Sequence, residues 1–491
     1  MGKDRNPAPT ADHSPPGGRP PRGLDLAVAL RRGDGPLHEQ LEQALRDAVA
    51  DGRLGAGTAL PSTRTLAGDL GVSRGVVVEA YAQLRAEGVL RTRPGGGTDV
   101  APPAAPPPVE APAGPVRRPP PTPRIDLRSY VPELGAFPRR GWADAAATAL
   151  REAPDGVLEG TDHQGTPALR AALAAYLGRA RGVRTDADGL VVTSGTTQSI
   201  ALLAEVLRDA GPVVVEGPGF PLHHELFRRA GIETIVVPVD RDGIDVGALP
   251  EGDVAAALVT PAHQFPLGGV LGPERRSALL AWAAARDALL IEDDYDGEYR
   301  YDRDAPPALQ GGAPERVAYL GTASKTLAGA TRLGWIAAPP GFRERLVAAK
   351  GWADGGTSVL VQLTMAELLT SGAYDRHVRR SRDRYRRRRD RLLRALDALL
   401  PEAEALGVAA GLHVTVRLPE PVDLTTLLQR AWTRGVALHG AVVGRTPGAA
   451  ESLPDHPLAG PMLLVGFGNL PDPSVERAAR ELAELVAEAR G

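Results

Sequence analysis

The chain lacks cysteine, long apolar runs and, almost completely, lysine. Without cysteine it can form no disulfide, no thiolate metal site and no cysteine nucleophile. No stretch approaches about 18 uninterrupted apolar residues, and the first residues carry proline, glycine and charge where a signal peptide would carry an apolar segment. These absences predict a cytoplasmic protein without a membrane span.

A strong excess of positive charge is also missing. The formal net charge is −3 over 491 residues, which excludes a globally basic nucleic-acid binder. Any contact with DNA must therefore come from a local basic patch. The length is ample for several domains, since one domain commonly has about 100–200 residues.

Only three of the 57 lysine and arginine residues are lysines. A lysine amine can lose its proton and attack a carbonyl to form a Schiff base, whereas an arginine stays protonated. Lys325 follows a strand-like run in VAYLGTASKTLAGATRLGW, which predicts it as the catalytic residue. Lys3, near the terminus, and Lys350, in a helical segment beside Arg343 and Arg345, are expected to be ordinary surface lysines.

Proline divides the chain into two folded bodies. Residues 1–23 have no hydrophobic periodicity and are expected to be a disordered tail. Residues 101–124 contain eleven prolines and no apolar face, which predicts a semi-rigid polyproline linker. The bodies on either side, 24–100 and 125–491, should therefore fold separately.

Three helices and a hairpin are predicted for residues 24–100. Ser62 and Ser73 are expected to cap the second and third helices, which end at Gly71 and Gly88. The run VLRTRPGGGTDV then predicts two short strands around a glycine-rich tip. A short helix, a tight turn, a second helix and a hairpin make up the small α+β plan of a winged helix-turn-helix.

The exposed residues of this plan are candidates for DNA contact, because they lie at helix starts, where backbone N–H groups favour phosphate, or in the hairpin. The candidates are Arg64, Ser73, Arg74, Arg91, Arg93 and Gly96. The segment LPSTRTLAGDLGVSRGVVVEAYAQLRAEGVL closely resembles the GntR-type winged helix, which implies a double-stranded DNA operator as partner. A small helical domain with solvated arginines is the alternative.

Residues 125–491 alternate short apolar runs with helical patterns. The runs that predict strands are GLVVTSG, GPVVVEGPG, AAALVTP, ALLIEDDY, RVAYLGT and LGWIAAP. Such alternation predicts an α/β fold with a mostly parallel sheet covered on both faces. Ligands of such sheets bind at the carboxyl ends of the strands, and the unusual motifs of this chain follow strands.

Several of these strand ends carry side chains suited to the phosphate of a phosphorylated aldehyde cofactor. The turn after the first strand contains Gly195, Thr196 and Thr197, whose N–H groups and hydroxyls can hold a phosphate dianion. Arg332 supplies a forked cation for the same phosphate, and Thr322 supplies a hydroxyl.

The ring of such a cofactor has candidates of its own. Asp293, in IEDDYDGEY, can keep a pyridine nitrogen protonated and so strengthen the ring as an electron sink. Tyr295 can hydrogen-bond a phenolic oxygen, and Phe220 can stack on a planar ring. Acidic runs such as EDDYD are usually solvated or directed at a metal. Here the preceding apolar strand and the downstream lysine argue against both, and no metal is expected.

Together these motifs make residues 125–491 resemble the fold-type I aminotransferases, which use pyridoxal 5′-phosphate. Further similarity lies in Phe137, Pro138 and Trp142, in the stretch DHQGTPALRAALAAYL, and in TPAHQFPLGG. The resemblance implies a homodimer through a domain whose large part spans about 165–375 and whose small part combines the C-terminal segment with 125–160. It implies a Schiff base on Lys325 and a cofactor site made of Lys325, Asp293, Tyr295, Gly195, Thr196, Thr197, Phe220, His263, Gln264, Thr322 and Arg332.

A GntR-type winged helix joined to such a domain is the plan of the MocR family of bacterial regulators, which includes the PdxR and GabR proteins. One departure concerns amino-acid binding. Relatives that turn over substrate carry an arginine shortly before the Gly-Phe of the last strand, whereas PMLLVGFGNL has Leu464 there. His163 and Gln164 also stand where an aromatic-Gly-Asp pattern is more usual. The bidentate clamp for a substrate carboxylate is therefore incomplete.

The arginine-rich run 377–396 has two interpretations. We favour the long helix that links the two aminotransferase subdomains, and contact with DNA phosphates stays open.

Three functions follow from these observations. The favoured one is a regulator that binds pyridoxal 5′-phosphate and changes how a dimer engages its operator, with vitamin B6 or amino-acid metabolism genes as candidate targets. The second is an active aminotransferase that carries a DNA-binding arm. The third is a DNA-binding protein whose cofactor domain only dimerises. The set Lys325, Asp293 and Arg332 argues against the third, and Leu464 argues against the second.

Overall fold

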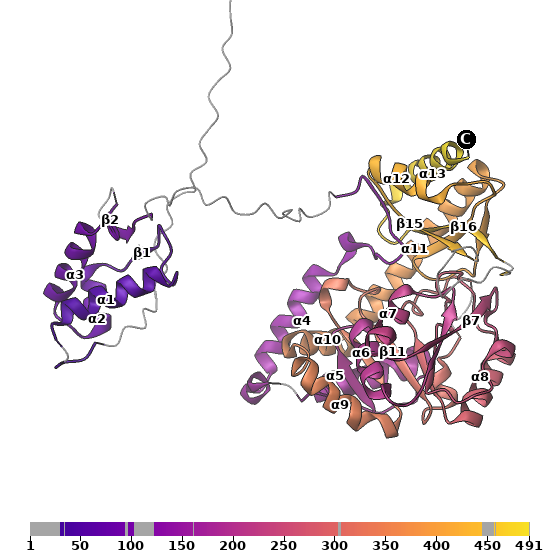
Figure 1. Cartoon of the computed structure of the whole chain (residues 1–491), viewed down its shortest axis with the longest axis horizontal. Coiled ribbons are helices and arrows are strands. Elements are labelled where there is room, and N and C mark those ends of the chain that lie inside the picture. Colours follow the sequence, from indigo (N-terminus) through magenta and orange to yellow (C-terminus); the bar gives the residue numbers. More distant parts are fainter. Residues whose placement is uncertain are drawn as a thin grey trace, which may run out of the picture. The chain divides into compact units, whose positions relative to one another are not determined.

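The structure, a computed structural model, describes residues 30–33, 35–93, 97–102, 122–160, 162–302, 306–443, 456 and 458–490. The chain divides into two compact units, Met1–Pro119 and Pro120–Gly491 (Figure 1). The predicted tail and most of the predicted linker lie outside the described residues.

The first unit is the predicted winged helix-turn-helix. Its elements are α1 (Leu37–Ala50), β1 (Ala59–Leu60), α2 (Thr63–Leu70), α3 (Arg74–Ala86), β2 (Leu90–Thr92) and β3 (Thr98–Val100). The strands pair antiparallel in the order β1-β3-β2. Leu41, Val77 and Tyr81 are buried in its core because helical spacing places them on inward faces.

The second unit is built on an eight-stranded sheet. In spatial order its strands are β5 (Leu190–Thr193), β12 (Gly334–Ala337), β11 (Val317–Thr322), β10 (Leu289–Asp293), β9 (Ala256–Val259), β6 (Val213–Gly217), β7 (Thr234–Asp240) and β8 (Gly243–Ile244). Alternate residues of one strand pack on opposite faces, as Leu290 and Ile291 of β10 do. The covering helices are α5 (Pro167–Arg181), α6 (Thr196–Leu207), α7 (Pro221–Arg229), α8 (Pro273–Arg286), α9 (Pro340–Asp354) and α10 (Val359–Thr370).

The centre of this sheet is parallel, as the sequence predicts, but β12 and β8 run against their neighbours. β12 follows β11 through residues 323–333, a connection with no α-helix. A parallel crossover needs about a dozen or more residues, usually with a helix. The strand therefore returns in the opposite direction, and its connecting loop, which carries Lys325 and Arg332, stays at the end of the sheet.

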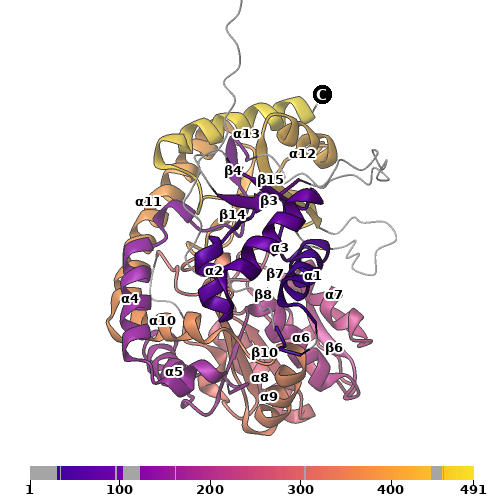
Figure 2. The ribbon, with the colours of Figure 1, turned by 90° about the vertical axis from the view of Figure 1, so that its left-hand side faces the viewer.

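A second, five-stranded sheet gathers segments that are far apart in the sequence (Figure 2). Its order is β13 (Glu404–Leu406), β14 (His413–Arg417), β16 (Gly460–Gly466), β15 (Val436–Val443) and β4 (Ile125–Leu127). β4 pairs parallel with β15 and so joins the first strand of the unit to its C-terminal part. The helices of this part are α11 (Ala373–Leu399), α12 (Leu424–Thr433) and α13 (Val475–Ala489), while α4 (Arg139–Glu152) packs on α10.

The arginine-rich run lies in α11, where several of its side chains hold other segments. Arg388 is buried and pairs with Glu133 and Asp472. Arg391 pairs with Glu476 of α13 at 2.8 Å. These ion pairs support the structural interpretation of this helix.

Across the part of the chain that the structure describes, no helix is long and apolar enough to cross a membrane.

Candidate cofactor cavity and DNA-facing residues

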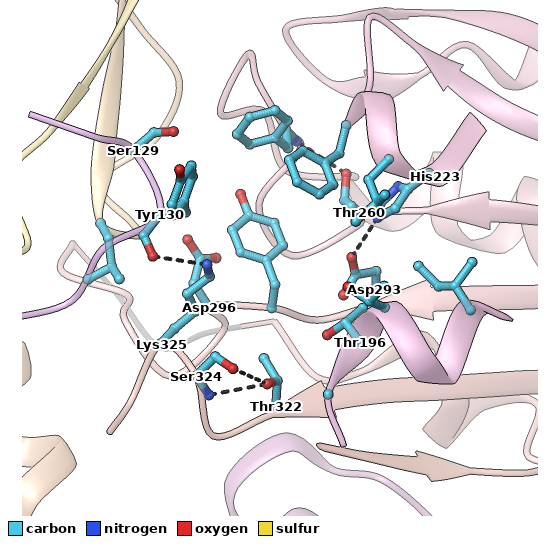
Figure 3. Close-up of a pocket in the computed structure, with 18 of the residues that line it drawn as sticks. Ser129, Tyr130, Thr196, His223, Thr260, Asp293, Asp296, Thr322, Ser324 and Lys325 are labelled. Atoms are coloured by element: carbon cyan, nitrogen blue, oxygen red, sulfur yellow. Dashed lines mark hydrogen bonds and ion pairs between the residues drawn. The ribbon is translucent and has the colours of Figure 1, made fainter. Parts of the chain in front are cut away.

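A cavity of about 420 Å³ opens at the carboxyl ends of β5, β9, β10 and β11 (Figure 3). Its walls also include Ser129 and Tyr130, which follow β4, and His413 of β14. Most of the predicted cofactor residues line it, namely Gly195, Thr196, Thr197, Phe220, Asp293, Tyr295, Thr322, Lys325 and Arg332. The two that do not are His263 and Gln264.

The amine of Lys325 lies in this cavity. Its Nζ donates to the backbone carbonyl of Tyr130 at 3.0 Å and forms no ion pair with the described residues. Burial lowers the pKa of Lys325, and the negative charges of Asp296 and Asp293 partly oppose that shift. A lowered pKa increases the fraction of neutral amine, which is the form that attacks a carbonyl.

Lys350 is not the surface lysine that the sequence predicts. Its side chain is fully buried, and its Nζ donates to both carboxylate oxygens of Asp354, at 2.9 and 3.0 Å. It also donates to Gln198 Oε1 at 3.2 Å. The i, i+4 spacing on α9 brings Lys350 and Asp354 to the same face, so this amine is held in an ion pair. Lys3 lies outside the described residues.

Asp293 ends β10 with one carboxylate oxygen paired and the other free. Its Oδ2 lies 3.1 Å from Nε2 of His223, in the first turn of α7. Its Oδ1 is buried and has no hydrogen-bond partner among the described residues. A buried acceptor without a donor is costly. A protonated pyridine nitrogen would supply the missing donor.

The other end of the cavity is suited to an anion. Gly195 precedes α6 with a φ of 121°, a conformation that residues with a Cβ rarely adopt. A Cβ at this position would lie 3.9 Å from Nη1 of Arg332, so the guanidinium lies beside the start of α6. Arg332 is exposed and forms no ion pair within the described part of the chain. Free N–H groups and a guanidinium are ligands that phosphate prefers.

Tyr295 faces the cavity with its hydroxyl direction fixed by a buried pair. His263 Nδ1 lies 3.0 and 3.2 Å from the two carboxylate oxygens of Asp296 and 3.1 Å from Tyr295 Oη. A carboxylate only accepts, so Nδ1 carries the hydrogen and donates it to Asp296, and this nitrogen cannot accept a hydrogen from Tyr295 Oη. Burial raises the pKa of Tyr295 well above its ordinary value. The phenol therefore keeps its own hydrogen, which is free to be donated into the cavity.

His263 thus supports Tyr295 from behind the cavity wall. Gln264 is fully buried, and its Nε2 donates to the carbonyls of Pro218 and Phe265, at 2.9 and 2.6 Å. Neither side chain is in a position to line the cavity, although the resemblance implied that both bind the cofactor. Thr322 Oγ1 donates to Leu333 O at 3.2 Å and thereby anchors the loop that carries Lys325.

These groups fit pyridoxal 5′-phosphate. The cavity offers a lysine amine with a lowered pKa for an aldehyde, an unpaired buried carboxylate oxygen for a ring nitrogen, and a guanidinium beside a helix start for a phosphate. The phenol of Tyr295 adds a donor for a ring oxygen. Among the described residues, no cluster of His, Cys, Asp and Glu is suited to a metal ion.

Sequence reasoning missed residues that come from distant segments. His223, Ser129, Tyr130, Asp296 and His413 all line the cavity. Burial lowers the pKa of His413 to about 3, so its ring stays neutral. The available signal for His223 was its place in the helix that follows β6, since strands of one parallel sheet end at the same edge.

The residues of the first unit that are predicted to contact DNA differ in their exposure and in their hydrogen-bond partners. Arg64 is exposed and has no hydrogen-bond or ion-pair partner among the described residues, while Arg74 Nε lies 3.4 Å from Thr63 Oγ1. Ser73 occupies the N-cap position of α3 but makes no capping hydrogen bond. Gly96 lies outside the described residues.

Arg91 and Arg93 face a carboxylate inside the wing. Arg91 Nε and Nη2 donate to the two oxygens of Asp99, at 3.0 and 3.2 Å, and Asp99 is fully buried. Arg93 Nε lies 3.8 Å from the same carboxylate. Arg91 therefore stabilises the hairpin, independently of its predicted contact with DNA.

Two families match this chain. Residues 37–100 match the bacterial regulatory proteins of the gntR family, and residues 125–445 match the aminotransferases of class I and II. The first match implies that the winged helix binds DNA.

Similar proteins combine both parts. The chain is 37% identical over 410 residues to the HTH-type pyridoxine biosynthesis transcriptional regulator PdxR of Corynebacterium glutamicum, covering 83% of this chain and 89% of that protein. It is 36% identical over 384 residues to the probable rhizopine catabolism regulatory protein MocR of Rhizobium meliloti, covering 73% and 77%.

Solved structures resemble the larger unit. The kynurenine aminotransferase of Pyrococcus horikoshii, in complex with PMP, is 28% identical with a TM-score of 0.66, covering 74% of this chain and 91% of that one. The α-aminoadipate aminotransferase LysN of Thermus thermophilus, bound to a phosphopyridoxyl-leucine, is 26% identical with a TM-score of 0.65, covering 74% and 92%.

Proposed function

Because the chain belongs to the MocR family of transcriptional regulators, we propose that pyridoxal 5′-phosphate is the ligand that controls its binding to DNA. The unpaired buried oxygen of Asp293 is the observation that carries this proposal. It leaves room in the wall of the cavity for one specific donor, the protonated ring nitrogen of this cofactor.

The remaining groups of the cofactor also find partners in this cavity. Lys325 would form the Schiff base with the aldehyde, and Arg332 with the start of α6 would hold the phosphate. Tyr295 would donate to the ring oxygen, and Phe220 would lie against the ring. When bound, the cofactor supplies an electrophilic carbon and an electron-withdrawing ring.

Regulation requires that the ligand bind two states of the protein with different affinity. We propose a homodimer formed through the larger unit, which presents two winged helices to one operator. The cofactor would shift the dimer between geometries that differ in operator affinity. Since the similar PdxR is named for pyridoxine biosynthesis, genes of vitamin B6 metabolism are the first candidate targets, and genes of amino-acid metabolism are the second. Action at an operator would take place in the cytoplasm.

An aminotransferase with a DNA-binding arm is the less favoured function. Leu464 is buried in β16, between Thr415 of β14 and His439 of β15. A leucine cannot orient a substrate carboxylate, and a positional error of about 1 Å can cost on the order of 100-fold in rate. We expect amino acids to convert the cofactor slowly or weakly.

Reductive trapping tests the cofactor assignment. Purified protein with added pyridoxal 5′-phosphate should gain visible absorption, and borohydride should fix the phosphopyridoxyl group on the peptide that contains Lys325. Pyridoxal without phosphate is the matched control, because it lacks the group that Arg332 would hold. Trapping on the Lys350 peptide, or no absorption, would contradict the assignment.

A further inference from the structure

A second cavity, of about 520 Å³, adjoins the first and shares part of its wall. The shared residues are Ser129, Tyr130, Phe220 and Phe265. Beyond them, aliphatic side chains of α12, β15 and β16 surround the space, namely Leu428, Leu438, Val442, Val443 and Leu464. We call this second cavity the side chamber.

Among the described residues that line the side chamber there is no lysine or arginine, and its two histidines are His224 and His439. The acidic side chain there is Glu216, which is buried and accepts hydrogen bonds from Thr260 N at 3.0 Å and from Gln264 Nε2 at 3.2 Å. A carboxylate placed here would meet aliphatic walls and a second acid, and burying an unpaired charge is strongly unfavourable.

One polar side chain of the side chamber offers a neutral donor. Ser129 N–H donates to Nδ1 of His439 at 3.4 Å, so this nitrogen carries no hydrogen. Burial and the positive charge of Arg128 lower the pKa of His439, so the ring stays neutral and carries its hydrogen on Nε2. His439 also stacks on Tyr130, with 4.9 Å between ring centres, which fixes its plane.

We propose that the side chamber receives the tail of a primary amine that has an apolar or aromatic body and no carboxylate. The amine would be a second ligand of the regulator, and this inference rests on the proposed cofactor function. Its nitrogen would bond to the aldehyde carbon that Lys325 holds, and the bond from that carbon to Lys325 would break. The incoming nitrogen loses its protons to the departing Lys325 amine, so no oxidant or reductant is needed.

The position of the carboxylate in an α-amino acid allows the side chamber to discriminate between amines and amino acids. The amine and the carboxylate of an α-amino acid are attached to the same carbon, so an amino acid whose nitrogen bonds at Lys325 and whose tail enters the side chamber carries its carboxylate beside the reacting nitrogen. The corresponding amine brings only hydrogen there. A neutral hydrogen-bond acceptor on the tail, such as a hydroxyl, can meet His439 Nε2.

Matched pairs test this inference with the full-length, cofactor-loaded protein. Phenethylamine is compared with phenylalanine, tyramine with tyrosine, and pentylamine with norleucine, by titration of the visible absorption. We expect each amine to reach half-saturation at a concentration at least about tenfold lower than its amino acid. Equal half-saturation, or a preference for the amino acids, overturns the inference while leaving the cofactor function intact. No visible absorption before any amine is added would overturn both.

Two variants sharpen the test. Leu464→Arg places a guanidinium in the side chamber and should reverse the preference by at least about tenfold towards the amino acids. Leu464→Met keeps an apolar side chain of similar volume and should retain the preference for amines. An unchanged preference in a folded, cofactor-binding Leu464→Arg protein would count against the inference, and the comparison of matched ligands on the parent protein decides it if that variant does not fold.

Discussion

The two units of this chain place their functional groups in opposite surroundings. In the first unit, Arg64 and Arg74 lie exposed on the helices, where long-range attraction to phosphate is strongest and salt screens it readily. In the second, Asp293 and Lys325 are withdrawn into a cavity, where burial shifts the pKa of the amine. One unit is suited to a large polyanion and the other to one small molecule. Substitutions should therefore separate DNA binding from cofactor binding.

The largest effect is expected for Lys325→Ala. It removes the amine that would bond to the cofactor, so reductive trapping should be lost completely, while operator binding without cofactor stays within about twofold. Lys350→Ala is the matched control, because that lysine is ion-paired outside the cavity. Mass spectrometry of the trapped peptide measures the result. If Lys325→Ala still traps the cofactor at another lysine, the cofactor cavity is wrongly assigned.

Asp293→Asn should have the next largest effect. It leaves the shape of the side chain but replaces a charged acceptor, and hydrogen bonds to charged groups contribute about 1.5–3 kcal/mol. The affinity for pyridoxal 5′-phosphate should fall roughly 10- to 100-fold. Equilibrium titration of the absorption measures it. Arg379→Gln, an exposed change on α11, serves as control. An unchanged affinity in Asp293→Asn would show that the carboxylate does not meet the ring.

Arg64→Ala and Arg74→Ala should weaken operator binding without changing the cofactor spectrum. If each arginine contacts one phosphate, the loss should be similar for all DNA sequences, and the salt dependence should decrease by about one unit per contact. An arginine that reads a base would instead cost about 1–3 kcal/mol at one position. Fluorescence anisotropy at several salt concentrations distinguishes these results. Unchanged affinity in both variants would place the DNA-binding face elsewhere.

Arg91→Ala should act through folding as well as binding. It removes the partner of the buried Asp99, so thermal unfolding of the first unit should shift downward. Adding Asp99→Asn should restore part of the loss, since the unpaired charge is then gone. Calorimetry measures both. A shift in DNA affinity with no change in unfolding would mean that Arg91 acts only at DNA.

The smallest effect is expected from a buried acid of the second unit. Burial and the charge of Asp294 raise the pKa of Glu298 to about 7. The folded protein therefore binds a proton at Glu298 more tightly than the unfolded chain does. The contribution of Glu298 to the free energy of unfolding falls as pH rises from about 5 through 7.

Glu298→Gln removes this titration. The unfolding free energy of the variant minus that of the parent should increase by about 1–3 kcal/mol between pH 5.5 and pH 8. Glu225→Gln is the control, because its arginine neighbours lower the pKa of that half-buried acid to about 2, outside this range. Denaturant titration at several pH values checks the difference. A difference between Glu298→Gln and parent that is independent of pH would contradict the assigned shift.

Much of this organisation could be predicted from local sequence signals. Apolar runs followed by turn residues indicate strands, and motifs at the ends of those strands must meet at one edge of a parallel sheet. That rule predicts that Gly195, Asp293 and Lys325 lie at the same cavity. The direction of β12 could also have been derived, because the connection from β11 is short.

Side-chain partners across long sequence separations could not be predicted. Tyr130 meets Lys325 across 195 positions, and His223 meets Asp293 only because α7 packs at the end of the sheet. The prediction that Lys350 lies at the surface was wrong for a local reason. Neighbouring arginines suggested a solvent-facing helix, whereas Asp354 one turn later was the better signal.

The central claim is that pyridoxal 5′-phosphate bound in the second unit controls DNA binding by the first. The most direct measurement titrates the cofactor into an operator-binding assay with the parent protein and with Lys325→Ala, at constant salt. We predict that operator affinity or the footprint of the parent changes at the same cofactor concentration as its absorption, and that Lys325→Ala shows no such change at that concentration. Operator binding that is indifferent to cofactor, together with rapid multiple-turnover transamination of amino acids, would contradict the account.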